Sequence, residues 1–126
     1  MKLLVVDDAA PLRRRIVSAV SQIQAIEVVG NVRHVRGAVQ EIGRLRPHVV
    51  ILDIHLPGGS GICVLESIKH ELPPTIVIMF TDLPAARYRR RCATAGANYF
   101  FEENLDFARL VRLLAHLAHE TPTKTA

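Results

Sequence analysis

The chain has 126 residues, 49% of them hydrophobic, which suits one compact domain and leaves no room for a second of ordinary size. No apolar run approaches the ~18 residues of a membrane-spanning helix, and the N-terminus passes from a short apolar stretch straight into acid, unlike a signal peptide. The net charge of +4 comes from dispersed arginines without interleaved aromatic residues, so we expect a cytoplasmic protein without direct nucleic-acid or membrane contact.

Short apolar runs alternate with longer amphipathic stretches along the chain. The runs are rich in β-branched and aromatic residues, as strands buried on both faces are. In chain order the predicted strands are residues 3–6, 27–32, 49–52, 76–80 and 99–101.

Apolar residues at helical spacing predict one helix after each strand. In chain order these apolar stripes cover residues 12–23, 38–45, 62–68, 85–95 and 107–117. Pro47 ends the second helix, Gly96 is suited to the end of the fourth, and Asn104 is a suitable N-cap for the fifth. Five strands alternating with five helices predict an α/β fold, a doubly wound parallel sheet with helices on both faces. We expect one domain over residues 1–119 and a polar C-terminal tail over residues 120–126.

Polar residues, mostly acids, follow four of the five predicted strands. They are Asp7-Asp8, Asp53, Thr81-Asp82 and Glu102-Glu103. Because the carboxyl ends of parallel strands share one edge of a sheet, these side chains should converge there. Gathered carboxylates without nearby His or Cys favour Mg²⁺ or another hard divalent cation over zinc. Since Mg²⁺ usually keeps waters and phosphate oxygens as its other ligands, a phosphoryl group is the natural companion.

Structural explanations exist for some of these acids. Asp8 or Asp82 could cap the helix that follows it. Asp53 is harder to explain in this way, because it follows the most apolar strand and an ionised group there costs several kcal/mol unless it is paired or hydrated. The sequence therefore favours a functional role for Asp53.

Together these residues resemble the CheY-like receiver domains of two-component signalling, over roughly residues 2–117. The matching features, in a specific order and spacing, are Asp7-Asp8, the acceptor-like loop of residues 53–61, Thr81 at the end of the fourth strand, and Ala95-Gly96-Ala97 before the fifth. The resemblance implies a flavodoxin-like (βα)5 fold. It also implies a response regulator domain that is not an enzyme, beyond catalysing its own phosphorylation and dephosphorylation.

The resemblance assigns roles to single residues. Asp53 would accept a phosphoryl group from a sensor histidine kinase or a phosphotransfer protein. Mg²⁺ would be held by Asp7, Asp8, Asp53 and the backbone carbonyl of His55. Thr81 would donate its hydroxyl to a phosphoryl oxygen, and Phe100 would be the switch aromatic that rotates inward. A surface on the fourth helix, fifth strand and fifth helix would then change its affinity for a downstream protein; dimerisation is compatible with this scheme.

One position departs from the family. The lysine that the family carries seven residues after the glycine matched by Gly96 is replaced here by Glu103. Asp82 adds a further carboxylate where the family usually has a small uncharged residue. The departure predicts a site that binds divalent cations well and stabilises the phosphorylated state poorly. Arg87 or Arg89 could reach back as a substitute cation.

Three functions are compatible with this pattern to different degrees. We favour a phosphorylation-dependent receiver over a pseudo-receiver, in which the same fold acts as a phosphorylation-independent protein-interaction module. Glu103 and Asp82 support the pseudo-receiver. A nucleotide-binding enzyme would need a glycine-rich phosphate loop after the first strand, and the sequence has none there. The arginines at 87, 89, 90 and 91 form a candidate surface for an acidic partner, or an ordinary solvated helix face.

Overall fold

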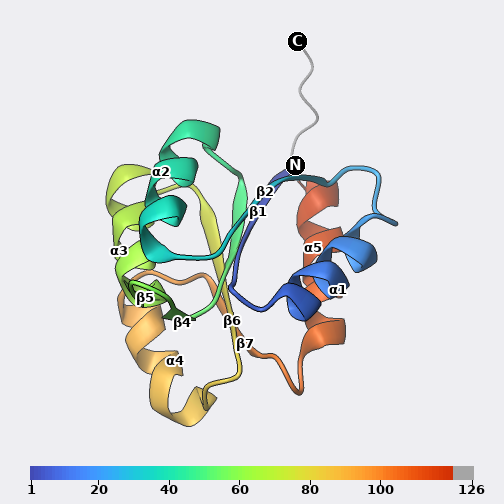
Figure 1. Cartoon of the computed structure of the whole chain (residues 1–126). Helices are drawn as coiled ribbons and strands as arrows, with labels where there is room; N and C mark the ends of the chain where they lie inside the picture. The colour runs from blue at the N-terminus through green and yellow to red at the C-terminus, as the bar shows by residue number, and fades with distance from the viewer. Residues whose placement is uncertain (121–126) are drawn as a thin grey trace.

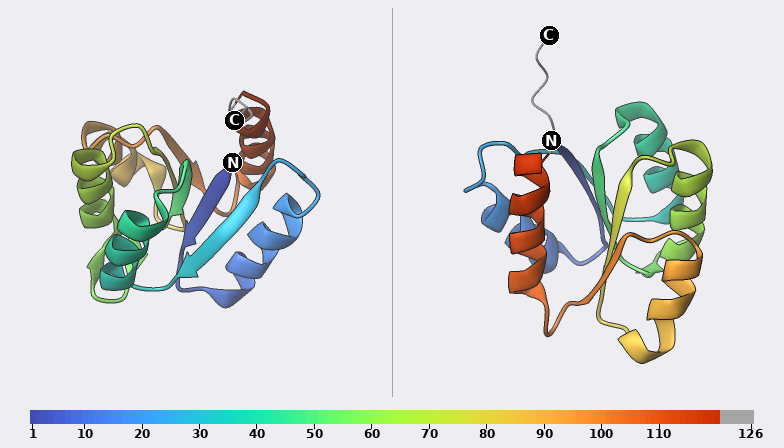
Figure 2. Two further views of the ribbon diagram at one scale, coloured as in Figure 1. Left: turned by 90° about the horizontal axis from the view of Figure 1, so that it is seen from above. Right: turned by 180° about the vertical axis from the view of Figure 1, so that it is seen from behind.

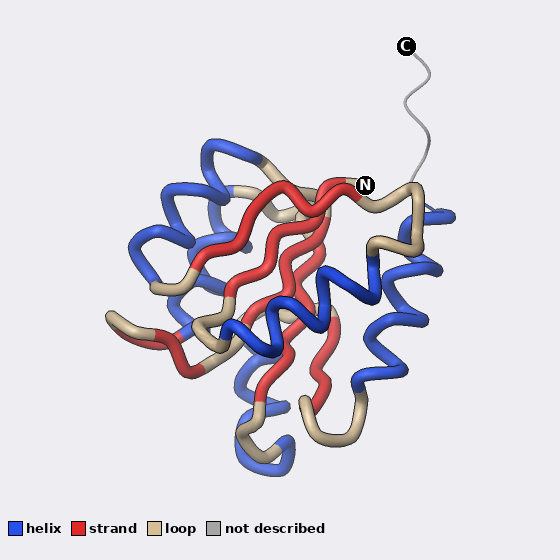
Figure 3. The backbone as a smooth tube through the Cα atoms, turned by 45° about the vertical axis from the view of Figure 1, so that its right-hand side comes forward, coloured by secondary structure: helices blue, strands red, loops and turns tan. Residues whose placement is uncertain are grey.

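A computed structural model describes residues 1–120 and shows one parallel sheet of five strands (Figures 1 and 3). The strands stand in the order β2-β1-β3-β6-β7. Their bounds are β1 (Lys2–Val6), β2 (Glu27–Val32), β3 (Val49–Leu52), β6 (Ile76–Thr81) and β7 (Tyr99–Glu102). All five predicted strands are confirmed. A short antiparallel pair that was not predicted, β4 (His55–Leu56) and β5 (Gly59–Ser60), follows β3.

Five helices cover the two faces of this sheet. Their bounds are α1 (Ala10–Val20), α2 (Val35–Leu45), α3 (Gly61–Glu71), α4 (Ala85–Thr94) and α5 (Phe107–Glu120). Helices α1 and α5 lie on one face and α2, α3 and α4 on the other, as two opposite views show (Figures 1 and 2). The predicted doubly wound α/β architecture is therefore confirmed. Within residues 1–120, none of the helices has the length and apolar character needed to cross a bilayer.

Alternate residues of each central strand pack against opposite helical layers. In β1, Leu4 and Val6 contact the core beneath α2, α3 and α4, whereas Leu3 and Val5 contact the core beneath α1 and α5. This two-residue period is what a strand covered on both faces requires. Every side chain of β3 is buried, so the sheet holds the residue after β3 in a fixed place.

The start of the last helix differs from its prediction. Helix α5 begins at Phe107, so Asp106 precedes it and the expectation of Asn104 as N-cap is wrong. The Asp106 carboxylate accepts a hydrogen bond from the backbone N–H of Glu102 (2.9 Å), which closes the turn between β7 and α5. Glu120, placed in the predicted tail, is the last residue of α5, and the rest of that tail lies outside the described residues.

The turn into α3 fixes the loop after Asp53. A Cβ at Gly61 would collide with the backbone oxygen of Asp53, so no larger residue fits without moving that loop. We expect Gly61→Ala to lower the free energy of unfolding by about 2–4 kcal/mol, the range of severe packing defects. Gly43, inside α2, is the matched control, because a Cβ there would meet no neighbouring side chain or loop within 4 Å.

Gly43→Ala should raise the free energy of unfolding by about 0.5–1 kcal/mol, because alanine is the better helix former. Urea denaturation followed by circular dichroism measures both variants. Equal effects of the two substitutions would show that the close approach of Gly61 to Asp53 does not govern this loop.

Candidate functional site

Strand register brings Asp7 and Asp53 together. Val6 of β1 pairs with Leu52 of β3, so the residues that follow them leave the sheet side by side. The backbone N–H of Asp53 donates to the carbonyl of Val6 (3.0 Å), and the backbone N–H of Asp7 donates to the carbonyl of Val32 (2.9 Å). This is the point where successive connections turn to opposite faces of the sheet, the usual ligand site of such folds.

The neighbouring pair of strands adds Thr81 and Glu103 to the same edge. Thr81 pairs with Glu102 across β6 and β7, and the backbone N–H of Glu103 donates to the carbonyl of Thr81 (2.8 Å). Thr81 is fully buried, and its hydroxyl accepts a hydrogen bond from the backbone N–H of Leu83 (3.2 Å). Glu103 is therefore held at the edge by the backbone, whatever its side chain contacts.

Three carboxylates meet at this edge. Asp7, Asp53 and Glu103 each offer an oxygen, and these oxygens lie within 4.8 Å of one another. Asp7 and Asp53 are 2% and 8% exposed, so water cannot fully screen their mutual repulsion. Oxygen ligands of this kind and separation suit a hard divalent cation such as Mg²⁺. We call these three residues the acidic triad.

The pKa values of the acidic triad report burial and repulsion. Burial is the main cause that raises the pKa of Asp7 to about 6; a hydrogen bond from the backbone of Ala9 opposes it, and the charges of Asp53 and Asp8 add to it. Burial and then the charges of Asp53, Asp7 and Asp82 raise the pKa of Glu103 to about 7. A cation bound among these carboxylates would offset both the cost of burying their charge and the repulsion between them.

Asp53 itself is stabilised by its neighbours. Burial raises its pKa, and the charge of Asp82 adds to the rise; a side-chain hydrogen bond from Thr81 and backbone hydrogen bonds from His55 and Ile54 offset only part of it. The backbone N–H of His55 lies 3.4 Å from Oδ1 of Asp53. Thr81, predicted to contact the phosphoryl group, thus already interacts with the predicted acceptor.

Other predicted site residues lie at the rim. Asp8 and Asp82 are exposed and act on the acidic triad through their charge, Asp8 on Asp7 and Asp82 on both Asp53 and Glu103. The capping alternative for them is wrong, because the N-caps of α1 and α4 are Ala9 and Pro84, without side-chain hydrogen bonds. Since Asp7 and Asp8 are consecutive, burying Asp7 at the strand end leaves Asp8 facing solvent.

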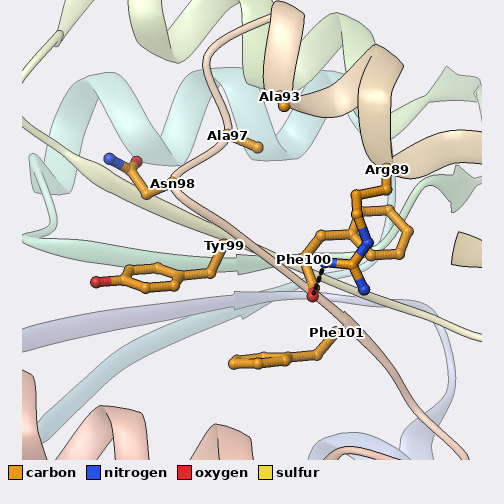
Figure 4. Close-up of a pocket in the computed structure, with 7 residues that line it drawn as sticks. All are labelled: Arg89, Ala93, Ala97, Asn98, Tyr99, Phe100 and Phe101. Carbon is orange, nitrogen blue, oxygen red and sulfur yellow. Dashed lines mark hydrogen bonds between the residues drawn. The ribbon is translucent and has the colours of Figure 1, made fainter.

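Phe100, the predicted switch aromatic, is buried against α4 (Figure 4). The Arg89 guanidinium lies 5.2 Å from the centre of the Phe100 ring, and its Nη1 donates to the Phe100 carbonyl (3.4 Å). These residues border a cavity of about 350 Å³ between α4 and β7. Arg89 is thereby turned away from its suggested role as substitute cation, and Arg87 lies instead over the Tyr88 ring at 5.6 Å.

Sequence reasoning missed the structural role of Glu102. Its Oε1 accepts a hydrogen bond from the backbone N–H of Ala85 (2.7 Å), which ties the end of β7 to the first residue of α4. Helix α4 is therefore fastened to the same strand end that carries Glu103. The acidic pair after β7 was visible in the sequence, but which member would face the site and which would hold α4 depends on the tertiary path.

Comparisons with known protein families and known sequences agree with each other. The family described as the response regulator receiver domain matches residues 3–115. A protein-glutamate methylesterase/protein-glutamine glutaminase of Alkalilimnicola ehrlichii is 39% identical over 102 residues, which are 79% of this chain and 26% of that protein. One of Hahella chejuensis is 33% identical over 121 residues, 90% of this chain and 31% of that protein. The chain thus spans less than a third of the length of these relatives.

Two solved structures show the same fold. The response regulator domain of Thermotoga maritima CheB superposes with a TM-score of 0.82 at 27% identity, covering 95% of this chain and 94% of that one. The receiver domain of NtrX from Brucella abortus has a TM-score of 0.80 at 27% identity, covering 95% of this chain and 99% of that one. The sheet edge that carries the acidic triad lies within the matched part of the chain.

Proposed function

Because this chain belongs to the response regulator receiver domain family of two-component signalling, we propose that Asp53 accepts a phosphoryl group from a sensor histidine kinase or a phosphotransfer protein. The observation that carries the proposal is the placement of Asp53, buried and within 4.8 Å of Asp7 and Glu103, beside the buried hydroxyl of Thr81. Aspartate carboxylates are nucleophiles that form aspartyl phosphates, and the acidic oxygens around Asp53 could hold the divalent cation that such a transfer needs.

The transfer exchanges one bond for another. A carboxylate oxygen of Asp53 attacks the phosphorus of a phosphohistidine, an O–P bond forms, the N–P bond breaks, and the donor imidazole leaves with the electron pair. Asp7, Asp53 and Glu103 would hold a divalent cation, which would supply positive charge to offset that of the phosphoryl group. We propose Asp8 and the backbone carbonyl of His55 as further ligands, direct or through water.

Thr81 and Phe100 would transmit the change. We propose that the Thr81 hydroxyl, which now accepts from Leu83, turns to donate to a phosphoryl oxygen. Phe100, in β7, packs against α4. Reorientation of the Thr81 and Phe100 side chains would therefore alter the surface that α4, β7 and α5 present to a downstream protein. Such a switch needs only a shift between two packings of the same few side chains.

Glu103 supports a second candidate, a pseudo-receiver that binds partners without phosphorylation. In the position of the family's lysine it contributes a carboxylate to the acidic triad, and a phosphoryl group on Asp53 would lie beside that charge instead of beside an ammonium. The two candidates differ in whether Asp53 becomes phosphorylated at all.

Intact-protein mass spectrometry separates the two candidates. After incubation with Mg²⁺ and acetyl phosphate, the phosphoacceptor account predicts one added phosphoryl group, absent in Asp53→Asn and absent when EDTA replaces Mg²⁺. Glu27→Gln, at the exposed start of β2 on the opposite edge of the sheet, is the control that should behave as the unaltered chain. An unchanged mass under all conditions would establish the pseudo-receiver instead.

A further inference from the structure

We propose that the groove between α3 and α4 binds an acidic segment of a partner protein through Arg87, Arg90 and Arg91. Figure 1 shows these helices as neighbours on one face of the sheet. The groove has a volume of about 500 Å³, and its lining consists of the three arginines with Ile62, Glu66, Thr94 and Ala95. We call it the basic groove.

Within residues 1–120, the three arginines of the groove form no ion pair with an acid. The arginines that do so in this described part of the chain are Arg44 and Arg109. The sequence of α4, AARYRRRCAT, contains no acid, and residues 87, 90 and 91 lie three and four apart, on one face of the helix. Like charges at this spacing repel each other, and an anionic ligand would remove that repulsion.

The shape and chemistry of the groove favour an acidic polypeptide. Guanidinium groups bind carboxylates through paired N–H donors in a planar arrangement. The partly exposed Ala95 supplies apolar surface beside the charges, as peptide side chains need; Ile62 also lines the groove but is buried. Among the described lining residues Glu66 is the one carboxylate, and a peptide can place a neutral residue beside it, whereas an evenly charged nucleic-acid backbone cannot. The same described lining has no aromatic residue on which a base could stack.

The basic groove is separate from the Phe100 surface. Arg89 borders the cavity beside Phe100, while Arg87, Arg90 and Arg91 border the groove on the α3 side of the same helix. The groove is therefore formed by side chains other than those proposed to switch, and this inference does not depend on the proposed phosphorylation.

A binding experiment with a defined probe tests the groove. Fluorescence anisotropy of a labelled oligoglutamate peptide should show binding to the unaltered chain, weakened about tenfold or more by the triple change Arg87→Gln, Arg90→Gln and Arg91→Gln. The matched control removes the same charge from exposed arginines elsewhere, as Arg33→Gln, Arg36→Gln and Arg112→Gln, and should lower the affinity far less.

An NMR titration of the unaltered chain with the same peptide keeps the test independent of the stability of the triple variant. Amide shifts concentrated on α3 and α4 around Ile62 and Arg90 would support the proposal. Equal weakening by both triple variants, shifts spread over the whole surface, or no binding would overturn it. Tighter binding of a labelled DNA duplex than of the peptide, lost in the α4 variant, would overturn it in favour of a nucleic-acid ligand.

Discussion

Glu103→Lys is expected to raise the equilibrium constant for phosphorylation of Asp53 by about 10- to 150-fold. The substitution removes a carboxylate that lies within 4.8 Å of the Asp53 and Asp7 carboxylates and puts an ammonium near the incoming phosphoryl group. A hydrogen bond to a charged group contributes about 1.5–3 kcal/mol, which corresponds to that range of equilibrium constants. The change should appear as a larger phosphorylated fraction at a fixed acetyl phosphate concentration.

Glu103→Gln separates the two parts of this effect. It removes the repulsion without adding a cation, so its phosphorylated fraction should lie between those of the unaltered chain and Glu103→Lys. Intact mass spectrometry at a Mg²⁺ concentration that saturates all three proteins gives all three values, so that a loss of metal affinity does not enter the comparison. If lysine gives no more phosphorylated protein than the unaltered chain, Glu103 does not limit phosphorylation and our account of this departure is wrong.

In EDTA, the free energy of unfolding should fall as the pH rises from about 4 to about 7, by roughly 3–5 kcal/mol. Asp7 and Glu103 have folded-state pKa values of about 6 and about 7, above the ordinary 3.8 and 4.5. Between these limits the folded chain binds more protons than the unfolded chain, so raising the pH favours unfolding. The magnitude allows for solvent screening of the partly exposed Glu103.

Urea denaturation in EDTA across this pH range measures the slope. Asp7→Asn and Glu103→Gln should each flatten it, because each removes one titrating group and part of the repulsion on the others. Millimolar Mg²⁺ should flatten it as well, since a bound cation favours the ionised carboxylates. Stability that stays level or rises with pH in EDTA would contradict the close packing of these carboxyl groups.

Most of the fold follows from local patterns in the sequence. The strands were predictable because β-branched runs such as residues 49–52 are too apolar and too short for anything but a buried strand. The β4–β5 pair was not predicted and the start of α5 was predicted wrongly, because neither produces a periodic pattern in the sequence. The β4–β5 pair contains two residues per strand, too few for a periodic signal, and α5 starts after Asp106 because that side chain binds the backbone of Glu102.

The site was partly predictable for a similar reason. Parallel strands with known order bring Asp7 and Asp53 to one edge, and no side-chain detail is needed to infer this. The entry of Glu103 into the acidic triad was suggested by the Glu102-Glu103 pair after the fifth strand as well as by its family position, and its approach to Asp7 depends on the backbone hydrogen bond to Thr81. Asp8 shows the limit of such reasoning, because the sequence does not tell which of two adjacent acids turns inward.

We expect Asp7, Asp53 and Glu103 to share one divalent cation. Electron paramagnetic resonance of Mn²⁺ counts free and bound ions directly and does not depend on phosphorylation. We expect one Mn²⁺ per chain, with affinity reduced at least ~10-fold in Asp7→Asn and in Glu103→Gln and unchanged in Glu27→Gln. A tenfold loss is the least to expect, because removing even a group that only hydrogen-bonds to a metal ligand lowers metal affinity by about that much. Equal Mn²⁺ affinity in all four proteins would show that these carboxylates do not share a cation.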